Sequence, residues 1–403
     1  MINEYFGVAP KGDLLLIQKL GEKFRSRSLV HINSTREGGG VAEILYRMIP
    51  IIHELGIDVR WEVMEGDERF YDITKKIHNA LQGYPEKISR QMWDYHFEVN
   101  QQNAGRLSLD SDAVFIHDPQ PSPLIKFKKK GTWMWRCHID VANPIHEVCN
   151  YLKKYCKKFD AAIFSVAQFA QEMPIAEFII PPSIDPFSEK NRELGDKEIK
   201  ETVDRLEIPT DRPIILQVSR FDRFKDPIGV IEAYRNVKKY NDCILILAGS
   251  PATDDPEGSE VLEEVRQYAA GDSDIKVLLL PPFSDKDINA LQRIATIVVQ
   301  KSLKEGFGLT VSEAMWKGKP VLGGAAGGIP LQIIHGITGF LVYSVEGAAF
   351  RIRQFLNNPG MAVRMGEKGK EYIRQNFLMT RQIRDYLSVW YALENRGKSI
   401  LEL

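Results

Sequence analysis

The residues best able to do chemistry are concentrated between Glu305 and Glu313, two glutamates separated by seven residues. The first glutamate is followed by Gly306, Phe307, Gly308, Leu309 and Thr310. Carboxylates accept hydrogen bonds from hydroxyl groups, and the free N–H groups at a helix N-terminus bind phosphate. A nucleotide sugar carries both kinds of group. The stretch therefore predicts Glu305 as an acceptor for sugar hydroxyls, the backbone of 306–310 as a phosphate site and Glu313 as an acceptor for ribose.

An alternative interpretation needs no ligand for the second glutamate. Thr310 and Glu313 have the spacing of a capping box, in which both side chains satisfy the N-terminus of a helix. The residues alone do not separate this role from a ligand contact. Glu305 has no comparable structural role, because it lies in a loop between apolar elements.

The elements around this stretch are those of a parallel sheet. The apolar run 296–299 is typical of a buried parallel strand. After the glycines, Val311, Ala314 and Met315 recur at helical spacing. The stretch is therefore predicted to connect the end of a strand to the start of a helix.

Two cations follow another predicted strand. Arg220 and Lys225 come after the apolar segment 213–219, and a helix is expected to begin at Pro227. An arginine can bind two phosphate oxygens at once, whereas a lysine acts as a point charge. The pair suits a diphosphate leaving group. The alternative is a solvated surface loop.

A βαβ unit is predicted near the start of the chain, with strands at 28–34 and 57–63. Its first turn contains Gly38, Gly39 and Gly40. This pattern differs from the spaced glycines of dinucleotide-binding proteins, so a nicotinamide site is not indicated. Adjacent glycines let the backbone approach a ligand closely, and phosphate is the expected ligand at the following helix N-terminus. An ordinary tight turn is the alternative.

Polar residues also follow two strands in the middle of the N-terminal half. Asp118 and Gln120 come after one predicted strand, and His138 and Asp140 come after the next. The carboxyl ends of parallel strands form the ligand-binding edge of such sheets. We therefore expect site residues here, with a loop cap for Asp118 and a structural role for His138 as the alternatives.

The composition sets further bounds. A chain of 403 residues is expected to form two domains, and its net charge of -1 does not indicate binding to nucleic acid or an anionic membrane. No apolar run has transmembrane length, and the first residues do not resemble a signal peptide. The four cysteines form no CxxC pair. These features together predict a cytoplasmic protein with reduced thiols.

The stretch 305–313 resembles the Glu-x7-Glu signature of retaining glycosyltransferases of family 4, which have the GT-B fold. The resemblance implies that Glu305 binds the donor sugar, that the following backbone amides bind the diphosphate and that Glu313 binds the ribose. Arg220 and Lys225 match the phosphate-binding pair of this family. The glycines at 38–40 match a loop that lies against the donor phosphate and the transferred sugar.

The segments 36–40 and 117–120 are most similar to those of the trehalose-forming members of this family. That similarity implies an acceptor site formed by Asp118, Gln120 and Asp140. His138 matches a histidine that hydrogen-bonds the donor sugar near its 6-hydroxyl in relatives, and the similarity implies the same contact here. The implied catalytic residues are Asp118, His138, Arg220, Lys225 and Glu305.

One departure from the family pattern lies before Gly327 and Gly328. Family members often carry a polar residue here, whereas this chain has Ala325 and Ala326. This chain therefore lacks any contact that the polar side chain makes in relatives.

The expected fold is α/β, of the GT-B type, with two doubly wound Rossmann-like domains facing each other across a cleft. Residues 1–187 are expected to form the acceptor-side domain, with a C-terminal helix at about 382–403 packing back on it. Residues 188–381 are expected to form the nucleotide-sugar domain.

The expected reaction is retaining transfer of glucose from UDP- or ADP-glucose to free glucose, which gives α,α-trehalose. The alternatives are a family 4 transferase with another acceptor, such as a sugar phosphate, and a non-catalytic sugar-binding protein. No cofactor is expected to be required, although a divalent cation such as Mg could stimulate the reaction. The D-x-D segments 110–112 and 272–274 precede strands instead of following them, so they are interpreted as turns and not as metal sites. No nucleic acid or membrane partner is expected, and a homodimer is left open.

Overall fold

Two compact units make up the protein in this computed structural model, which describes residues 2–36, 39–249, 256–398 and 400–401. The first unit combines Met1–Ser183 with Met379–Leu403, and the second unit is Ile184–Leu378. The chain therefore passes from one unit to the other twice, at 183–184 and at 378–379. Next to these passages, Ile184 forms a parallel β-bridge with Leu378.

The first unit contains a six-stranded parallel sheet with the order β2-β1-β3-β4-β5-β6. Its strands are β1 (Ser28–Asn33), β2 (Asp58–Val63), β3 (Ala113–His117), β4 (Thr132–Arg136), β5 (Ala161–Phe164) and β6 (Ala176–Ile179). Its helices are α1 (Lys11–Lys23), α2 (Gly39–Glu54), α3 (Glu68–Leu81), α4 (Arg90–Arg106), α5 (His146–Cys156) and α14 (Met379–Glu394), with short 3-10 turns at Ile2–Gly7, Ser122–Phe127 and Ala167–Phe169. Every residue of β3 and β5 is buried, as expected for central strands of a sheet covered on both faces.

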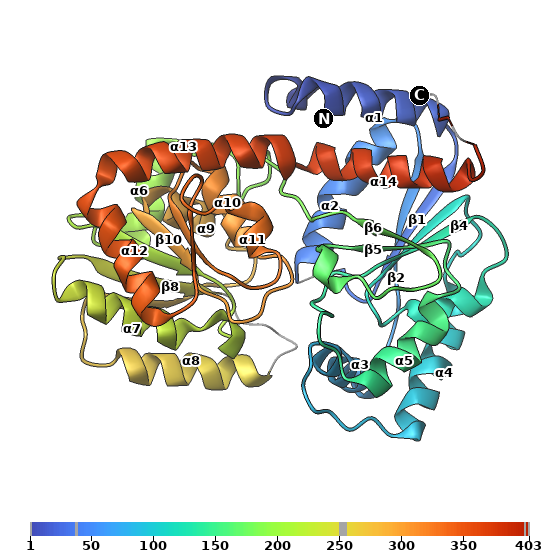
Figure 1. The fold of residues 1–403 in the computed structure, drawn as a ribbon, viewed down its shortest axis with the longest axis horizontal. Helices are drawn as coiled ribbons and strands as arrows, with labels where there is room; N and C mark the ends of the chain where they lie inside the picture. The colour runs from blue at the N-terminus through green and yellow to red at the C-terminus, as the bar shows by residue number, and fades with distance from the viewer. Residues whose placement is uncertain (1, 37–38, 250–255, 399, 402–403) are drawn as a thin grey trace. The chain divides into compact units, whose positions relative to one another are not determined.

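The last helix, α14, packs against α1 within the first unit (Figure 1). The rings of Phe24 and Trp390 stack at 3.8 Å with an angle of 5° between their planes. Arg27 pairs with Glu394 at 2.7 Å. The C-terminal residues therefore complete the fold of the N-terminal unit.

Replacing Trp390 with alanine is expected to destabilise the first unit by about 3–5 kcal/mol, because the fully buried indole would leave a cavity. Of the six tryptophans, only Trp316 lies in the second unit, so tryptophan fluorescence during urea unfolding reports mainly on the first. Trp93→Ala is the matched control, because Trp93 also stacks on a ring, that of Tyr151 at 3.9 Å, but is only half-buried. An equal loss in the two variants would contradict the bracing role of α14.

The second unit contains another six-stranded parallel sheet, with the order β12-β11-β10-β7-β8-β9. Its strands are β7 (Ile214–Val218), β8 (Ile244–Gly249), β9 (Ile275–Leu279), β10 (Ile297–Gln300), β11 (Val321–Gly324) and β12 (Phe340–Val342). Its helices are α6 (Asp196–Arg205), α7 (Pro227–Lys238), α8 (Pro256–Ala269), α9 (Asp285–Ile294), α10 (Leu309–Trp316), α11 (Ile329–Gln332), α12 (Val345–Asn357) and α13 (Pro359–Asn376), with a 3-10 turn at Arg223–Lys225. The strand pattern confirms the predicted α/β class, with alternating strands and helices in both units.

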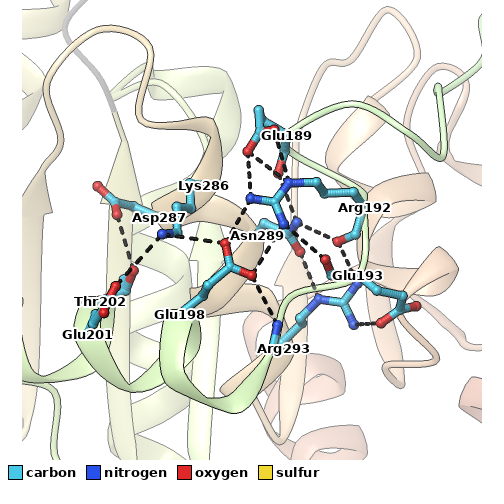
Figure 2. Close-up of polar contacts among 11 residues, drawn as sticks. Glu189, Arg192, Glu193, Glu198, Glu201, Thr202, Lys286, Asp287, Asn289 and Arg293 are labelled. Carbon is cyan, nitrogen blue, oxygen red and sulfur yellow. Dashed lines mark hydrogen bonds and ion pairs between the residues drawn. The ribbon is translucent and has the colours of Figure 1, made fainter.

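The charged segment that enters the second unit is tied to α6 and α9 (Figure 2). Arg192 binds Glu189 and Glu198, in each case at 2.9 Å. The side-chain amide of Asn289 on α9 donates to the carbonyl oxygens of Glu189 and Arg192, both at 2.8 Å. Arg293 of the same helix pairs with Glu193 at 2.6 Å. These contacts hold the segment against its own unit.

In the described part of the chain, no helix is both long enough and apolar enough to cross a membrane.

Candidate functional site

A lysine and a glutamate from two loops of the second unit meet at the carboxyl end of its sheet. Nζ of Lys225 donates to Oε2 of Glu305 at 2.7 Å, and the hydroxyl of Ser302 donates to the same oxygen at 3.1 Å. The side chain of Lys225 is 16% exposed and that of Glu305 is 9% exposed. Among the described residues, Oε1 of Glu305 receives no hydrogen bond. One carboxylate oxygen is thus held by the protein and the other is available to a ligand.

Lys225 is positioned by the turn between β7 and α7. Its carbonyl oxygen accepts a hydrogen bond from Gln217 of β7 at 2.7 Å. The next residue, Asp226, adopts a left-handed conformation and caps α7 through the N–H of Gly229. Its carboxylate also pairs with the largely buried Lys301. The predicted partner cation, Arg220, is 53% exposed and lies 3.7 Å from Asp222.

Glycines shape the loop that carries Glu305. Gly308 has φ +83° and forms the N-cap of α10. Gly327 has φ +52°, and a Cβ placed there would lie 1.5 Å from the carbonyl oxygen of Glu305. A Cβ on Gly328 would lie 2.5 Å from the ring of Phe307. The loop after β11 therefore packs directly on the loop of Glu305, and only glycine allows that approach.

The capping-box interpretation of Thr310 and Glu313 is wrong. Helix α10 begins at Leu309 with Gly308 as its N-cap, and no side chain caps it. Thr310 is therefore already inside the helix. Glu313 lies further along and is 2% exposed.

The buried carboxylate of Glu313 has polar neighbours from two other segments. Gln292 donates to its Oε2 at 3.4 Å, and Nζ of Lys190 lies 3.9 Å from its Oε1. Its role as a ribose acceptor stays a prediction. Phe283, just before α9, is 84% exposed and therefore lies outside the core.

The strand ends of the first unit bring Asp118 and His138 together. Oδ1 of Asp118 accepts a hydrogen bond from the backbone N–H of His138 at 2.8 Å, and Asp118 itself has φ +66°. Its own N–H donates to the carbonyl oxygen of Arg136 at 2.8 Å. Burial raises the pKa of the Asp118 carboxyl to about 6. The group can therefore change its charge near neutral pH.

Arg136 is a charged neighbour that the sequence analysis missed. Its side chain is fully buried at the end of β4, where one guanidinium nitrogen donates to Ser165 at 3.1 Å. Nε and Nη1 have no hydrogen-bond partner among the described residues. The sequence pattern of this strand did not mark Arg136, and only the pairing of β4 with β3 shows that the cation lies opposite His117.

The other two predicted acceptor residues are held by local contacts. The carbonyl oxygen of Gln120 accepts hydrogen bonds from His96 and Asn100, both at 3.0 Å. Its side-chain oxygen is buried and has no partner in the part of the chain that the structure describes. Oδ1 of Asp140 accepts from the N–H of Ala142 at 3.0 Å. Gly38 lies outside the described residues, and Gly39 begins α2, followed by Gly40.

Within the described ranges, no three histidine, cysteine, aspartate or glutamate side chains lie together in a way that could hold a metal ion. In the first D-x-D segment Asp112 accepts from the N–H of Ser28 at 2.8 Å, and in the second Asp274 pairs with Arg212 at 2.8 Å. Both carboxylates thus bind groups of the protein that lie far away in the sequence.

Solved structures with this architecture are glycosyltransferases of the GT-B type. The trehalose-6-phosphate synthase OtsA matches with a TM-score of 0.74 at 13% identity, over 90% of this chain and 98% of the other. The sucrose-phosphate synthase from Thermosynechococcus elongatus matches with a TM-score of 0.71 at 17% identity, over 92% and 100% of the two chains. These likenesses confirm the predicted GT-B fold.

The particular family follows from the sequence comparisons. Residues 31–171 match the family model "Trehalose synthase, N-terminal domain", and residues 198–372 match "Glycosyl transferases group 1". The trehalose synthase of Pyrococcus horikoshii is 43% identical over 97% of this chain and 96% of its own length. The trehalose synthase of Rubrobacter xylanophilus is 41% identical over 94% of this chain and 93% of its own length. The chain belongs to the glycosyltransferase family that contains these trehalose synthases.

Proposed function

We propose that the protein transfers a glucosyl group from a nucleoside diphosphate glucose to free glucose, with retention at the anomeric carbon, and so forms α,α-trehalose. The observation that carries the proposal is the contact between Lys225 and Glu305. It places a cation for phosphate beside a carboxylate for sugar hydroxyls, next to the N-terminus of α10. The relatives that match over nearly their whole length are trehalose synthases, which supports the disaccharide product.

The donor is bound by the second unit in this proposal. The free oxygen of Glu305 accepts a hydrogen bond from a hydroxyl of the glucose, and Glu313 accepts one from a ribose hydroxyl. Lys225, the exposed Arg220 and the N–H groups that open α10 stabilise the charge that grows on the departing diphosphate. These groups make no covalent bond to the sugar, and the departing diphosphate takes the proton of the acceptor hydroxyl.

The acceptor glucose is assigned to Asp118, Gln120 and Asp140, and His138 donates to the transferred sugar. Gly39 and Gly40 begin a helix N-terminus that suits the donor phosphate. No metal ion is assigned a role. Activity measured with and without Mg tests whether a divalent cation stimulates the reaction.

A sugar-phosphate acceptor would need an additional basic cluster, and the candidate is the lysine-rich segment 126–130. Two of its lysines are already paired: Lys128 with Asp160 at 2.6 Å and Lys130 with Asp110 at 3.0 Å. This pairing favours free glucose as the acceptor. A non-catalytic sugar-binding protein would leave the two predicted phosphate-binding cations, Arg220 and Lys225, unexplained.

A product assay tests the proposal. The protein is incubated with radiolabelled UDP-glucose or ADP-glucose and with either glucose or glucose 6-phosphate, with and without Mg, and the products are identified by chromatography and anomeric NMR. An α,α-linked non-reducing disaccharide from free glucose is the expected result. Product from glucose 6-phosphate alone would replace the acceptor, and failure to bind either nucleotide sugar would overturn the role of Glu305.

A pH profile tests the role of Asp118. Because its ionised form is the hydrogen-bond acceptor, kcat/KM for glucose is expected to rise with pH through about 6, where the buried carboxyl loses its proton. The Asp118→Asn variant should be less active and should lack this limb. The raised pKa also means that ionisation costs folding free energy, so the contribution of Asp118 to stability falls as pH rises from about 4 to about 6 and stays low above it.

The sign of that stability change can be checked by thermal unfolding. The melting temperature of Asp118→Asn relative to that of the wild type should be higher at pH 7 than at pH 4. An acidic limb that persists in Asp118→Asn would assign the titration to another group.

A further inference from the structure

Three histidines of the first unit form a continuous hydrogen-bonded row, which we call the imidazole relay: His31, His117 and His138. Nδ1 of His31 lies 2.9 Å from Nε2 of His117, and Nδ1 of His117 lies 2.9 Å from Nε2 of His138. The histidines come from β1, the end of β3 and the loop after β4, which are neighbours in the sheet. The relay therefore runs from the core of the sheet to its carboxyl edge.

The rings are fixed in place by packing. Those of His31 and His117 have centroids 5.2 Å apart, and those of His117 and His138 are 5.3 Å apart. The ring of His31 also stacks on Phe115 at 4.8 Å. His31 and His117 are buried, whereas His138 is partly exposed.

All three rings are neutral at neutral pH. Burial lowers the pKa of His31 to about 3. Burial, together with the positive charge of Arg136, lowers the pKa of His117 and of His138 well below the usual value. Each neutral ring has one N–H, so the relay has three N–H groups and two internal hydrogen bonds. One N–H is left over at one end or the other.

The two ends of the relay are not equivalent. Nε2 of His31 is buried and has no hydrogen-bond partner among the described residues. Buried N–H groups without a partner are rarer in proteins than buried acceptors without one, and each costs about 1–3 kcal/mol. The other end is Nδ1 of His138, on the partly exposed residue. The spare N–H is therefore more stable on His138, and each ring then carries its proton on Nδ1.

We propose that His31 and His117 are positioning residues that hold His138 with its proton on Nδ1, so that this nitrogen is a hydrogen-bond donor to the substrate. The proposal rests on the proposed function only for the identity of that substrate, a sugar hydroxyl oxygen. The tautomer itself is set by the relay, whether or not substrate is bound. His31, two strands away from His138, thereby favours the register in which Nδ1 of His138 is a hydrogen-bond donor.

The tautomer can be measured by ¹⁵N NMR on the full chain labelled at its eight histidines. Long-range ¹H–¹⁵N correlations distinguish a protonated ring nitrogen from an unprotonated one, and His138 is assigned from the signal lost in His138→Gln. The expected result is a protonated Nδ1 and an unprotonated Nε2 on His138 without substrate. A protonated Nε2 would overturn the proposal.

Variants at His117 separate the relay from simple packing. His117→Phe fills the space but removes the donor to Nε2 of His138, so the relay no longer fixes the tautomer of that partly exposed ring. His117→Phe is expected to populate both tautomers of His138 and to lower kcat/KM for the nucleotide sugar about tenfold, the value of one neutral hydrogen bond. His117→Asn keeps an amide N–H near the position of Nδ1 and should restore both readouts.

Phe115→Leu is the matched control, because it disturbs the ring stacked on His31 without removing a relay nitrogen. It should lower the melting temperature and leave the His138 tautomer unchanged. A single Nδ1–H tautomer in His117→Phe would overturn the proposal. Because the NMR measurement needs no turnover, absence of transferase activity would contradict the proposed function and leave the relay standing.

Discussion

Lys225→Met is expected to lower kcat by about 10²–10³-fold, the usual effect of removing one preorganised group that stabilises charge in a transition state. The ammonium group lies 2.7 Å from the carboxylate of Glu305 and is largely buried, so water cannot replace it easily. Loss of the lysine removes the nearest cation from the position assigned to the leaving diphosphate. The effect should therefore appear in kcat as well as in the affinity for the donor.

The same substitution has a second, separable effect. Without Lys225, the buried carboxylate of Glu305 keeps only Ser302 as a hydrogen-bond donor, and an unpaired buried charge destabilises a fold. The double variant Lys225→Met/Glu305→Gln should recover melting temperature relative to Lys225→Met but recover no activity. Lys239→Met, at an exposed lysine after α7, is the control and should change neither.

Steady-state kinetics with the nucleotide sugar, together with thermal unfolding, measure both effects. If Lys225→Met retained wild-type kcat, the assignment of this lysine to the diphosphate would be wrong. If the double variant regained activity, the lysine would act only by neutralising Glu305.

Gly327→Ala is expected to lower kcat/KM by about 10²-fold, because it displaces the loop that carries Glu305. Misplacing reacting groups by about 1 Å can cost this much. The added methyl carbon would lie 1.5 Å from the carbonyl oxygen of Glu305, which is far inside van der Waals contact. The backbone of one loop or the other must therefore move.

Gly336→Ala provides the matched control in the same unit. Gly336 also has positive φ, +80°, but nothing lies within 4 Å of the Cβ position. Both variants carry the strain of alanine in a left-handed conformation, about 1–2 kcal/mol, and only Gly327→Ala carries the collision. Similar activities in the two variants would show that the position of Glu305 tolerates movement of its neighbour.

Much of the fold could be predicted from local patterns. Apolar runs bounded by glycine, proline and polar residues mark most strands of the two sheets, and the helix after Pro227 begins where its sequence indicates. The capping box failed because Gly308, with its left-handed backbone, already ends the loop, so that the helix starts before Thr310. Local spacing does not reveal which residue takes positive φ.

The residues of the candidate site could be predicted from the sequence, but the contacts between them could not. Lys225 and Glu305 are 80 positions apart, and their hydrogen bond depends on β7 and β10 being neighbours in the sheet. The sequence alone singled out neither Arg136 nor His31, because each lies among apolar or aromatic neighbours in its strand. Their relation to His117 arises only when three strands pair in order, which no single segment encodes.

The two passages of the chain between its units have a consequence for biosynthesis. The second unit is one contiguous segment whose ends are joined by the Ile184–Leu378 bridge, so it resembles a domain inserted into the first. During translation the second unit is complete before Met379 is made. The first unit begins earlier but has all of its residues only once α14 has left the ribosome, so the whole second unit is available to fold before the first unit is complete.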